Sequence, residues 1–301
     1  MNKLETNLCG VIMQNPVIAA SGTFGFGSEY NQIIDVKRLG GISGKGLTLN
    51  GSQGNSGMRI YETSSGIINS IGLENPGVKH FVDVESKKMR EYLPCISIAN
   101  LGGHSEEDYL KGAELLNNAD IDIVELNISC PNVKKGGMAF GMMPDTAAEI
   151  TEKIKKVSRF PLIVKLSPNA SDIVNVAKAV EQAGADGVSL VNTFLGMAID
   201  TKKKAPVFNN IYAGVSGPAI MPIALRMVHQ VAKNVSIPVI GLGGIMTTDD
   251  ALQFIMAGAS AIQVGSATFA NPSAMINIID GLSKYCDENG LSNISEIRGI
   301  V

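Results

Sequence analysis

Leu162-Ile163-Val164-Lys165-Leu166 is a short apolar run that is interrupted by a single charged residue. A half-exposed strand would alternate apolar and polar residues, so this run predicts a strand that is covered on both faces. A helical pattern over 172–183 follows it and ends at a Gly184 turn, and the next apolar run begins at Gly187. Strand, helix, glycine turn and strand in this order indicate a parallel sheet wrapped by helices.

The same alternation extends along the whole chain. Eight apolar runs that end in Gly, Asn, Ser or Lys are predicted as strands, at 16–20, 41–45, 95–100, 123–129, 162–166, 187–192, 238–242 and 261–265. Helical patterns, several opened by Asp, Ser or Thr caps, lie between them at 78–92, 106–117, 146–157, 172–183, 218–233 and 248–257. We therefore predict an α/β fold of the (β/α)8 TIM-barrel type that forms one domain over 1–301.

Segments outside this alternation fall into two kinds. The stretch 6–13 precedes the first strand, and we expect it to form a short N-terminal hairpin that closes the barrel floor. The longest irregular stretches, 47–75, 130–144 and 193–217, follow strands two, four and six. Loops after strands build the active site of a barrel, so we expect the chemistry there.

Composition and charge exclude several classes of protein. The 301 residues are 45% apolar and carry a formal charge of −3, which suits a folded core and argues against a face that binds nucleic acid. The first 21 residues have the pattern of neither a signal peptide nor a membrane span, so we expect a cytoplasmic protein. The cysteines at 9, 95, 130 and 286 are far apart, which predicts no metal site or iron–sulfur cluster in this chain.

Glycine turns follow the last two predicted strands. Gly243-Gly244 and Gly265-Ser266 stand where backbone amides can close on an anion, and barrels of this kind bind phosphate after strands seven and eight. FMN, pyridoxal phosphate and sugar phosphates all bind at this corner, and the glycines could also serve only tight turns.

Two lysines and one cysteine stand at strand ends. Lys45 and Lys165 should point to the barrel mouth, where a cation stabilises negative charge on a reduced flavin or a substrate carboxylate, although either could be a surface lysine. Cys130 begins the loop after strand four, where a thiolate could abstract a proton, whereas a lone cysteine is otherwise more often buried and structural.

Asparagines are frequent at the same strand ends and in the same loops, at Asn69, Asn100, Asn127, Asn132 and Asn192. An amide offers a donor beside an acceptor, so several amides can frame a ring with alternating C=O and N–H groups without adding charge. Asparagine is also common in turns, and each of these residues alone could serve only that role.

With these features, nearly the whole chain resembles the dihydroorotate dehydrogenases, a family of FMN-binding barrels in de novo pyrimidine biosynthesis. The resemblance is carried by motifs in the order of that family: AASG at 19–22, SGKG at 43–46, NSIGL at 69–73, NISCPN at 127–132, VKLSP at 164–168 and the two glycine turns. It implies that dihydroorotate is oxidised to orotate, with Cys130 as the base that takes the C5 proton while a hydride leaves C6 for flavin N5.

The resemblance also implies two sets of binding residues. The FMN set is Ser21, Lys45, Gly46, Asn100, Asn127, Lys165, Val191, Gly217, Gly243, Gly244, Gly265 and Ser266. The substrate set is Lys45, Asn69, Ser70, Ile71, Gly72, Leu73, Asn127, Asn132, Asn192 and Thr193.

Within the family, the chain resembles the class 1, NAD-linked type B catalytic subunits, because it has a cysteine base and type-B-like stretches at 132–141 and 190–197. It lacks both a Rossmann Gly-x-Gly-x-x-Gly fingerprint and clustered cysteines. The resemblance therefore implies a partner subunit with FAD and a [2Fe–2S] cluster, docked on a homodimer of barrels to form a heterotetramer.

Three alternative functions are considered. A fumarate-linked dihydroorotate dehydrogenase would share the chemistry but not the partner. A tRNA dihydrouridine synthase-like flavoenzyme would need a basic RNA-binding face, against which the negative charge argues. A phosphate-ligand sensor without redox function would be colourless and would take up no FMN.

Overall fold

The computed structural model describes residues 2–92, 96–128 and 141–301, and eight parallel strands form its centre. They are β3 (Val17–Ala19), β4 (Gly41–Ser43), β7 (Ile96–Leu101), β8 (Ile123–Asn127), β9 (Leu162–Lys165), β10 (Gly187–Leu190), β15 (Val239–Leu242) and β16 (Ala261–Val264). They pair into a closed barrel in the order β10-β15-β16-β3-β4-β7-β8-β9. All eight predicted strands and the predicted (β/α)8 barrel are thereby confirmed.

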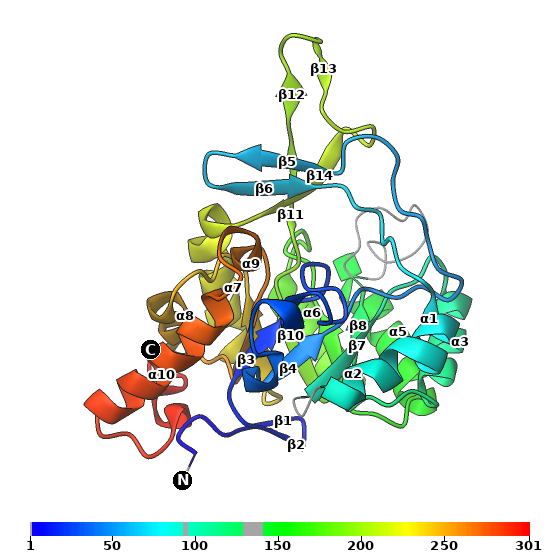
Figure 1. Ribbon diagram of the computed structural model, residues 1–301. Coiled ribbons are helices and arrows are strands. Elements are labelled where there is room, and N and C mark those ends of the chain that lie inside the picture. The colour runs from blue at the N-terminus through cyan, green and yellow to red at the C-terminus, as the bar shows by residue number, and fades with distance from the viewer. Residues whose placement is uncertain (1, 93–95, 129–140) are drawn as a thin grey trace.

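Helices surround the barrel (Figure 1). They include α1 (Val78–His80), a π-helical segment (Phe81–Glu85), α2 (Ser86–Tyr92), α3 (Glu106–Leu116), α5 (Pro144–Val157), α6 (Ile173–Gln182), α7 (Met221–Ala232), α8 (Thr248–Met256), α9 (Ala267–Ala270) and α10 (Ala274–Glu288). Ser105, Asp172 and Thr247 accept a backbone N–H at the starts of α3, α6 and α8, so the predicted caps are present. Each of the six predicted helices is confirmed within a few residues.

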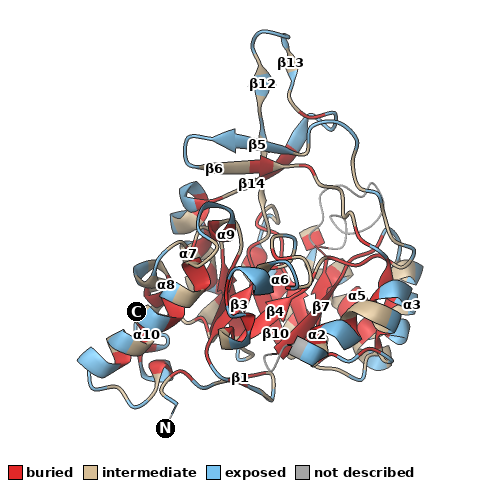
Figure 2. Cartoon of the chain, in the orientation of Figure 1, coloured by how far each residue is buried: buried red, intermediate tan, exposed pale blue. Residues whose placement is uncertain are grey.

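The barrel interior is layered by the two-residue period of its strands. On β8, Ile123, Glu125 and Asn127 point inward in turn, whereas Val124 and Leu126 belong to the apolar layer between strands and helices. Figure 2 shows the buried residues gathered on the strands and on the helix faces against them. The interior therefore changes from an apolar floor to a polar mouth.

The floor of the barrel is closed by a short hairpin. Strands β1 (Thr6–Leu8) and β2 (Val11–Met13) pair antiparallel, with Leu8 opposite Val11. The fully buried Leu8 and the almost fully buried Met13 pack with an inward-facing layer of apolar side chains, Ile18, Ile96, Ile98, Ile123, Ile163, Ile240 and Ala261. The predicted N-terminal hairpin is confirmed in both position and packing.

Two of the stretches that we predicted as irregular form a second sheet, and that prediction is wrong. Its strands are β5 (Ile60–Thr63), β6 (Gly66–Asn69), β11 (Phe194–Met197) and β14 (Tyr212–Ser216), in the order β11-β14-β6-β5. This antiparallel sheet, called the roof sheet below, lies above the barrel mouth, and the hairpin of β12 (Ile199–Asp200) and β13 (Ala205–Pro206) extends beyond it (Figure 1). Its strands are short, and β6 joins the local hairpin of β5 and β6 to the distant β14, so no local period marks the sheet.

Among the helices in the described ranges, none combines the length and the apolar character of a bilayer span.

Candidate functional site

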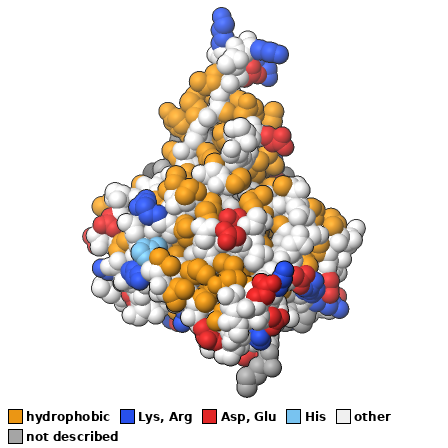
Figure 3. Space-filling view, turned by 90° about the vertical axis from the view of Figure 1, so that its left-hand side faces the viewer, with side chains coloured by type: hydrophobic (Ala, Val, Ile, Leu, Met, Phe, Trp, Pro, Cys, Tyr) orange, Lys and Arg blue, Asp and Glu red, His pale blue; other side chains and the backbone are white. Residues whose placement is uncertain are grey.

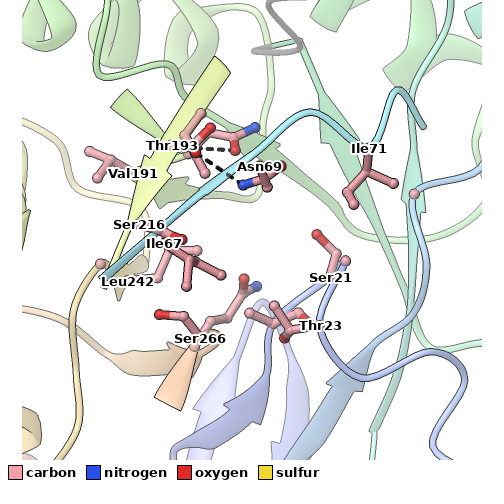
Figure 4. Close-up of a pocket in the computed structure, with 18 of the residues that line it drawn as sticks. Ser21, Thr23, Ile67, Asn69, Ile71, Val191, Thr193, Ser216, Leu242 and Ser266 are labelled. Carbon is pink, nitrogen blue, oxygen red and sulfur yellow. Dashed lines mark hydrogen bonds between the residues drawn. The ribbon is translucent and has the colours of Figure 1, made fainter. Parts of the chain in front are cut away.

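A cavity of about 320 Å³ lies at the carboxyl ends of the barrel strands, beneath the roof sheet. Figure 4 shows the side chains that surround it: Ser21 and Thr23 follow β3, Ile67 and Asn69 lie on β6, and Val191 and Thr193 follow β10. Its volume is in the range of pockets that hold small molecules. The barrel supplies the base and walls of this cavity, and the roof sheet supplies its cover.

Most of the residues in the two predicted binding sets line this one cavity. From the FMN set it is lined by Ser21, Lys45, Gly46, Asn100, Asn127, Lys165, Val191, Gly243, Gly244, Gly265 and Ser266. From the substrate set, besides Lys45 and Asn127, it is lined by Asn69, Ile71, Gly72, Leu73, Asn192 and Thr193. The structure therefore brings together residues from widely separated loops, and their individual contacts with FMN or substrate stay predictions.

Two predicted residues are not among those that line the cavity. The carbonyl oxygen of Gly217 would lie 2.8 Å from a Cβ atom added to Gly244, so Gly217 packs behind the glycine turn. Ser70 is buried, and its hydroxyl accepts hydrogen bonds from the amides of Asn55 (3.0 Å) and Asn210 (3.3 Å). Both residues support the wall of the cavity from outside.

The remaining two predicted residues, Cys130 and Asn132, lie outside the described residues. The chain reaches them from Asn127, which lines the cavity, and from the fully buried Ile128. The role of Cys130 as the base stays a prediction.

The glycine turn after β15 is required by the backbone itself. Gly243 and Gly244 have φ angles of +130° and +77°, and added Cβ atoms would lie 2.6 Å from Ala224 and 2.7 Å from Met221. By contrast, a Cβ on Gly265 would meet no protein atom closer than 3.5 Å. Turn geometry and packing therefore explain Gly243 and Gly244, whereas close packing within the protein does not explain Gly265.

Below the cavity lies a carboxylate that the sequence analysis did not identify. Glu125 is fully buried inside the barrel, and its two carboxylate oxygens accept four hydrogen bonds. The donors come from four different strands: Ser43 (2.8 Å), Asn100 (2.7 Å), Ser189 (2.7 Å) and Gln263 (2.8 Å). A glutamate at an inward position of an otherwise apolar strand, two residues before Asn127, was the signal available in the sequence.

Opposing effects act on the pKa of Glu125. Burial alone would raise this pKa, but the positive charge of Lys165 and the hydrogen bonds from Ser189, Asn100 and Gln263 outweigh it. The pKa therefore lies below its ordinary value of 4.5, and the group is a carboxylate at neutral pH. The barrel thus holds a fixed negative charge directly beneath its mouth.

A chain of amide hydrogen bonds leads from Glu125 to the cavity wall. Asn100 donates to Glu125 and accepts from the Asn127 amide at 3.3 Å. Asn127 in turn accepts from the Asn192 amide at 3.4 Å, and Asn192 accepts from the backbone N–H of Thr193 at 2.8 Å. We call this series of hydrogen bonds the amide chain. In each of its bonds, the donor is the residue farther from Glu125 along the series.

Comparison with known proteins identifies relatives over nearly the full length. The family model described as dihydroorotate dehydrogenase matches residues 3–286. Three relatives bear the name dihydroorotate dehydrogenase B (NAD(+)), catalytic subunit. They come from Petrotoga mobilis (51% identical over 297 residues), Brachyspira hyodysenteriae (52% over 301) and Bacteroides thetaiotaomicron (49% over 300), and each alignment covers 99% of both chains.

Proposed function

The chain belongs to the dihydroorotate dehydrogenase family, so it is an oxidoreductase of pyrimidine biosynthesis that oxidises dihydroorotate, and we propose that FMN at the barrel mouth accepts the hydride. One observation above all supports this proposal: Lys165, Asn100, Asn127 and the two glycine turns line a single cavity. Amides and an ammonium group suit a ring with C=O and N–H groups, and the turns suit its phosphate.

The donors and acceptors around the cavity fit a flavin. The Oε1 atom of Gln263 is buried at the cavity and accepts no hydrogen bond from the described residues, which suits a ligand that brings a ring N–H. Gly265 leaves room for an approaching phosphate, because a side chain there would meet no protein atom closely. Gly243 and Gly244 hold the neighbouring turn in a conformation that presents backbone rather than side chains.

We assign the steps at the substrate to side chains of this chain. When bound, FMN supplies a hydride acceptor at N5. Cys130 takes the proton from C5 of dihydroorotate while a hydride leaves C6, so the substrate loses one proton and one hydride and becomes orotate. Lys165 is almost fully buried and lines the cavity, so its ammonium group would help to hold the flavin ring and would stabilise negative charge on the reduced ring.

The names of the relatives support the NAD-linked type over the fumarate-linked type. Their description as a catalytic subunit implies a partner subunit for those proteins, and we propose one for this chain too. It would carry FAD and a [2Fe–2S] cluster and pass electrons to NAD, docked on a homodimer of barrels in a cytoplasmic heterotetramer. The absence of a Gly-x-Gly-x-x-Gly fingerprint from this sequence agrees with NAD binding elsewhere.

The proposal is tested by mixing FMN-loaded protein anaerobically with dihydroorotate and following the visible flavin band. Wild type should bleach within seconds, and Cys130→Ala should bleach about a hundredfold or more slowly, as expected after loss of a general base. Cys9→Ser is the matched control, since Cys9 lies at the barrel floor and a serine can keep its hydrogen bond to the Asp186 carbonyl.

The outcomes separate the parts of the proposal. No bleaching of FMN-loaded wild type would contradict the substrate assignment, and equal rates for Cys130→Ala and Cys9→Ser would contradict the base. Reoxidation of the reduced protein by fumarate alone would contradict the NAD-linked type. Reoxidation by NAD only after the iron–sulfur subunit is added would support it.

A further inference from the structure

The carboxylate of Glu125 has its hydrogen-bonding capacity filled from all sides of the barrel. Oε2 accepts from Ser43 on β4 and Asn100 on β7, and Oε1 accepts from Ser189 on β10 and Gln263 on β16. An ionised carboxylate accepts hydrogen bonds and donates none. Each of its partners must therefore turn a donor toward it.

For the two amides among these partners, this requirement selects one of two orientations. Asn100 must direct Nδ2 at Glu125, which leaves Oδ1 to accept from Asn127. Rotation of the Asn100 amide by 180° would place two oxygens in contact in the barrel interior. The orientation of Asn127 and Asn192 then follows along the amide chain. One buried charge thus determines which way three cavity-lining amides face.

Gln263 is oriented in the same way. Its Nε2 is held by Glu125 at 2.8 Å, and its buried Oε1 is the atom that accepts no hydrogen bond from the described residues. A buried acceptor without a hydrogen-bond partner is unfavourable. A ligand N–H at the base of the cavity would remove that penalty.

We propose that Glu125 is a positioning residue of this site: its hydrogen bonds from Asn100 and Gln263 set the donor and acceptor pattern that Asn100, Asn127, Asn192 and Gln263 present to the bound flavin and substrate. The proposal rests on the proposed function for the identity of the ligands. The orientation argument itself rests only on the hydrogen bonds of the barrel interior.

A purely structural role explains Glu125 less well. Burying a carboxylate is unfavourable, and well-packed apolar residues in place of a buried ionic group are often neutral or stabilising. The apolar cluster inside the barrel includes Ile123, two residues before Glu125 on the same strand, and Ile163, which pairs with Glu125 on the next strand. An apolar side chain at position 125 could therefore extend that cluster. The charge instead stands one layer beneath Asn127 and Lys165, where its position affects ligand recognition.

The test compares Glu125→Gln, which keeps the shape but adds donors and removes the charge, with Glu125→Asp, which keeps the charge but is one methylene shorter. Ser189→Ala is the matched control, because it removes one hydrogen bond to the same carboxylate and leaves every amide orientation unchanged. Thermal unfolding establishes that each variant is folded. FMN affinity of the apoprotein and orotate affinity from the shift in flavin absorbance are then measured.

Glu125→Gln should weaken FMN and orotate binding by roughly tenfold or more each, as expected when buried polar groups lose their partners. Glu125→Asp should weaken orotate binding by about fivefold, and Ser189→Ala should stay within about threefold of wild type. If Glu125→Gln does not fold, the proposal is tested by comparing the orotate affinities of Glu125→Asp and Ser189→Ala. The proposal would be overturned if the folded Glu125 variants bound FMN and orotate as tightly as wild type, or if Ser189→Ala lost as much affinity as they do.

Failure of the proposed function is recognised separately. In that case FMN-loaded wild type neither bleaches with dihydroorotate nor shifts its spectrum with orotate. The FMN affinities of the same variants would still decide whether Glu125 positions the cavity-lining amides.

Discussion

Lys165 donates a hydrogen bond from Nζ to the Ser21 hydroxyl over 3.3 Å, although the two residues stand on opposite sides of the barrel. Lys165 ends β9 and Ser21 follows β3, and these strands are four apart in either direction around the barrel. The Lys165 side chain is only 3% exposed. The Lys165 side chain therefore reaches across the barrel at the cavity that both residues line.

Replacement of Lys165 by methionine should slow flavin bleaching by dihydroorotate about a hundredfold, because the variant removes a preorganised cation from the site of developing charge. Stopped-flow absorbance under anaerobic conditions measures this rate. Lys87→Met is the control, since Lys87 is an exposed residue on the outer helix α2. Equal bleaching rates for the two variants would show that Lys165 has no part in the reaction.

The glycine turns should respond differently to alanine. Gly244→Ala introduces strain at a φ of +77° and a clash with Met221, so it should lower the free energy of unfolding by about 1–3 kcal/mol and weaken FMN binding. Gly265→Ala has room for its methyl group, so it should unfold like wild type but still weaken FMN binding.

Urea unfolding and flavin fluorescence titration separate these two effects. Unchanged FMN affinity in Gly265→Ala would place the phosphate away from the turn after β16. Wild-type stability in Gly244→Ala would mean that the turn relaxes without strain.

The floor hairpin should contribute strongly to stability. Leu8 is fully buried against the barrel isoleucines, so Leu8→Ala should lower the free energy of unfolding by about 2–5 kcal/mol. Ile12→Ala on the same hairpin is the control, because Ile12 is 57% exposed and should change this free energy by less than about 0.5 kcal/mol. Urea unfolding measures both changes in free energy. A similar loss of stability in the two variants would argue against the packing of Leu8 at the barrel floor.

Cys9 should be nearly inert to alkylation. Burial, and then the negative charge of Asp186, raise the pKa of its thiol from 9.0 to about 12, so at pH 8 its thiolate fraction is roughly a thousandfold lower than that of an unperturbed cysteine. Peptide mass spectrometry after brief iodoacetamide treatment measures the reactivity. Labelling of Cys9 as fast as that of an unfolded control would contradict this burial.

The same raised pKa has a consequence for stability. The neutral thiol is the form that the folded protein favours, so this contribution is complete below pH 9 and is lost as the pH rises toward 12. Cys9→Ser should therefore show a weaker loss of stability than wild type between these pH values, as measured by urea unfolding. Parallel curves for the two proteins would contradict the assignment.

Charge and apolar surface are distributed unevenly over the outside of the molecule. Figure 3 shows hydrophobic side chains on the face turned to the viewer and lysines at the far end of the upper projection. The lysines of the β12–β13 hairpin, Lys202, Lys203 and Lys204, are exposed at this tip. Neither feature was apparent from composition, since a count of charges does not say where they gather.

Local chemistry in the sequence was sufficient for the barrel and for the lysines, asparagines and glycine turns of the cavity, whereas the rest of the predicted lining came from the family resemblance. Apolar runs of strand length, helix caps and glycine turns each depend on neighbours within a few residues, so their pattern could be followed without coordinates. The carboxyl ends of the strands in a barrel meet at one face, so residues at those ends were expected to converge. The assignment of residues 1–301 to one domain stays a prediction.

Only the tertiary structure decided the roof sheet, the supporting positions of Gly217 and Ser70, and the central place of Glu125. In the roof sheet, β6 pairs with β14, although more than half of the barrel sequence separates the two strands. Such non-local pairing leaves no periodic signal in either segment. In the sequence, Glu125 is only one acidic residue in an apolar strand. Its role becomes visible in the closed barrel, which brings hydrogen-bond donors from four strands to its carboxylate.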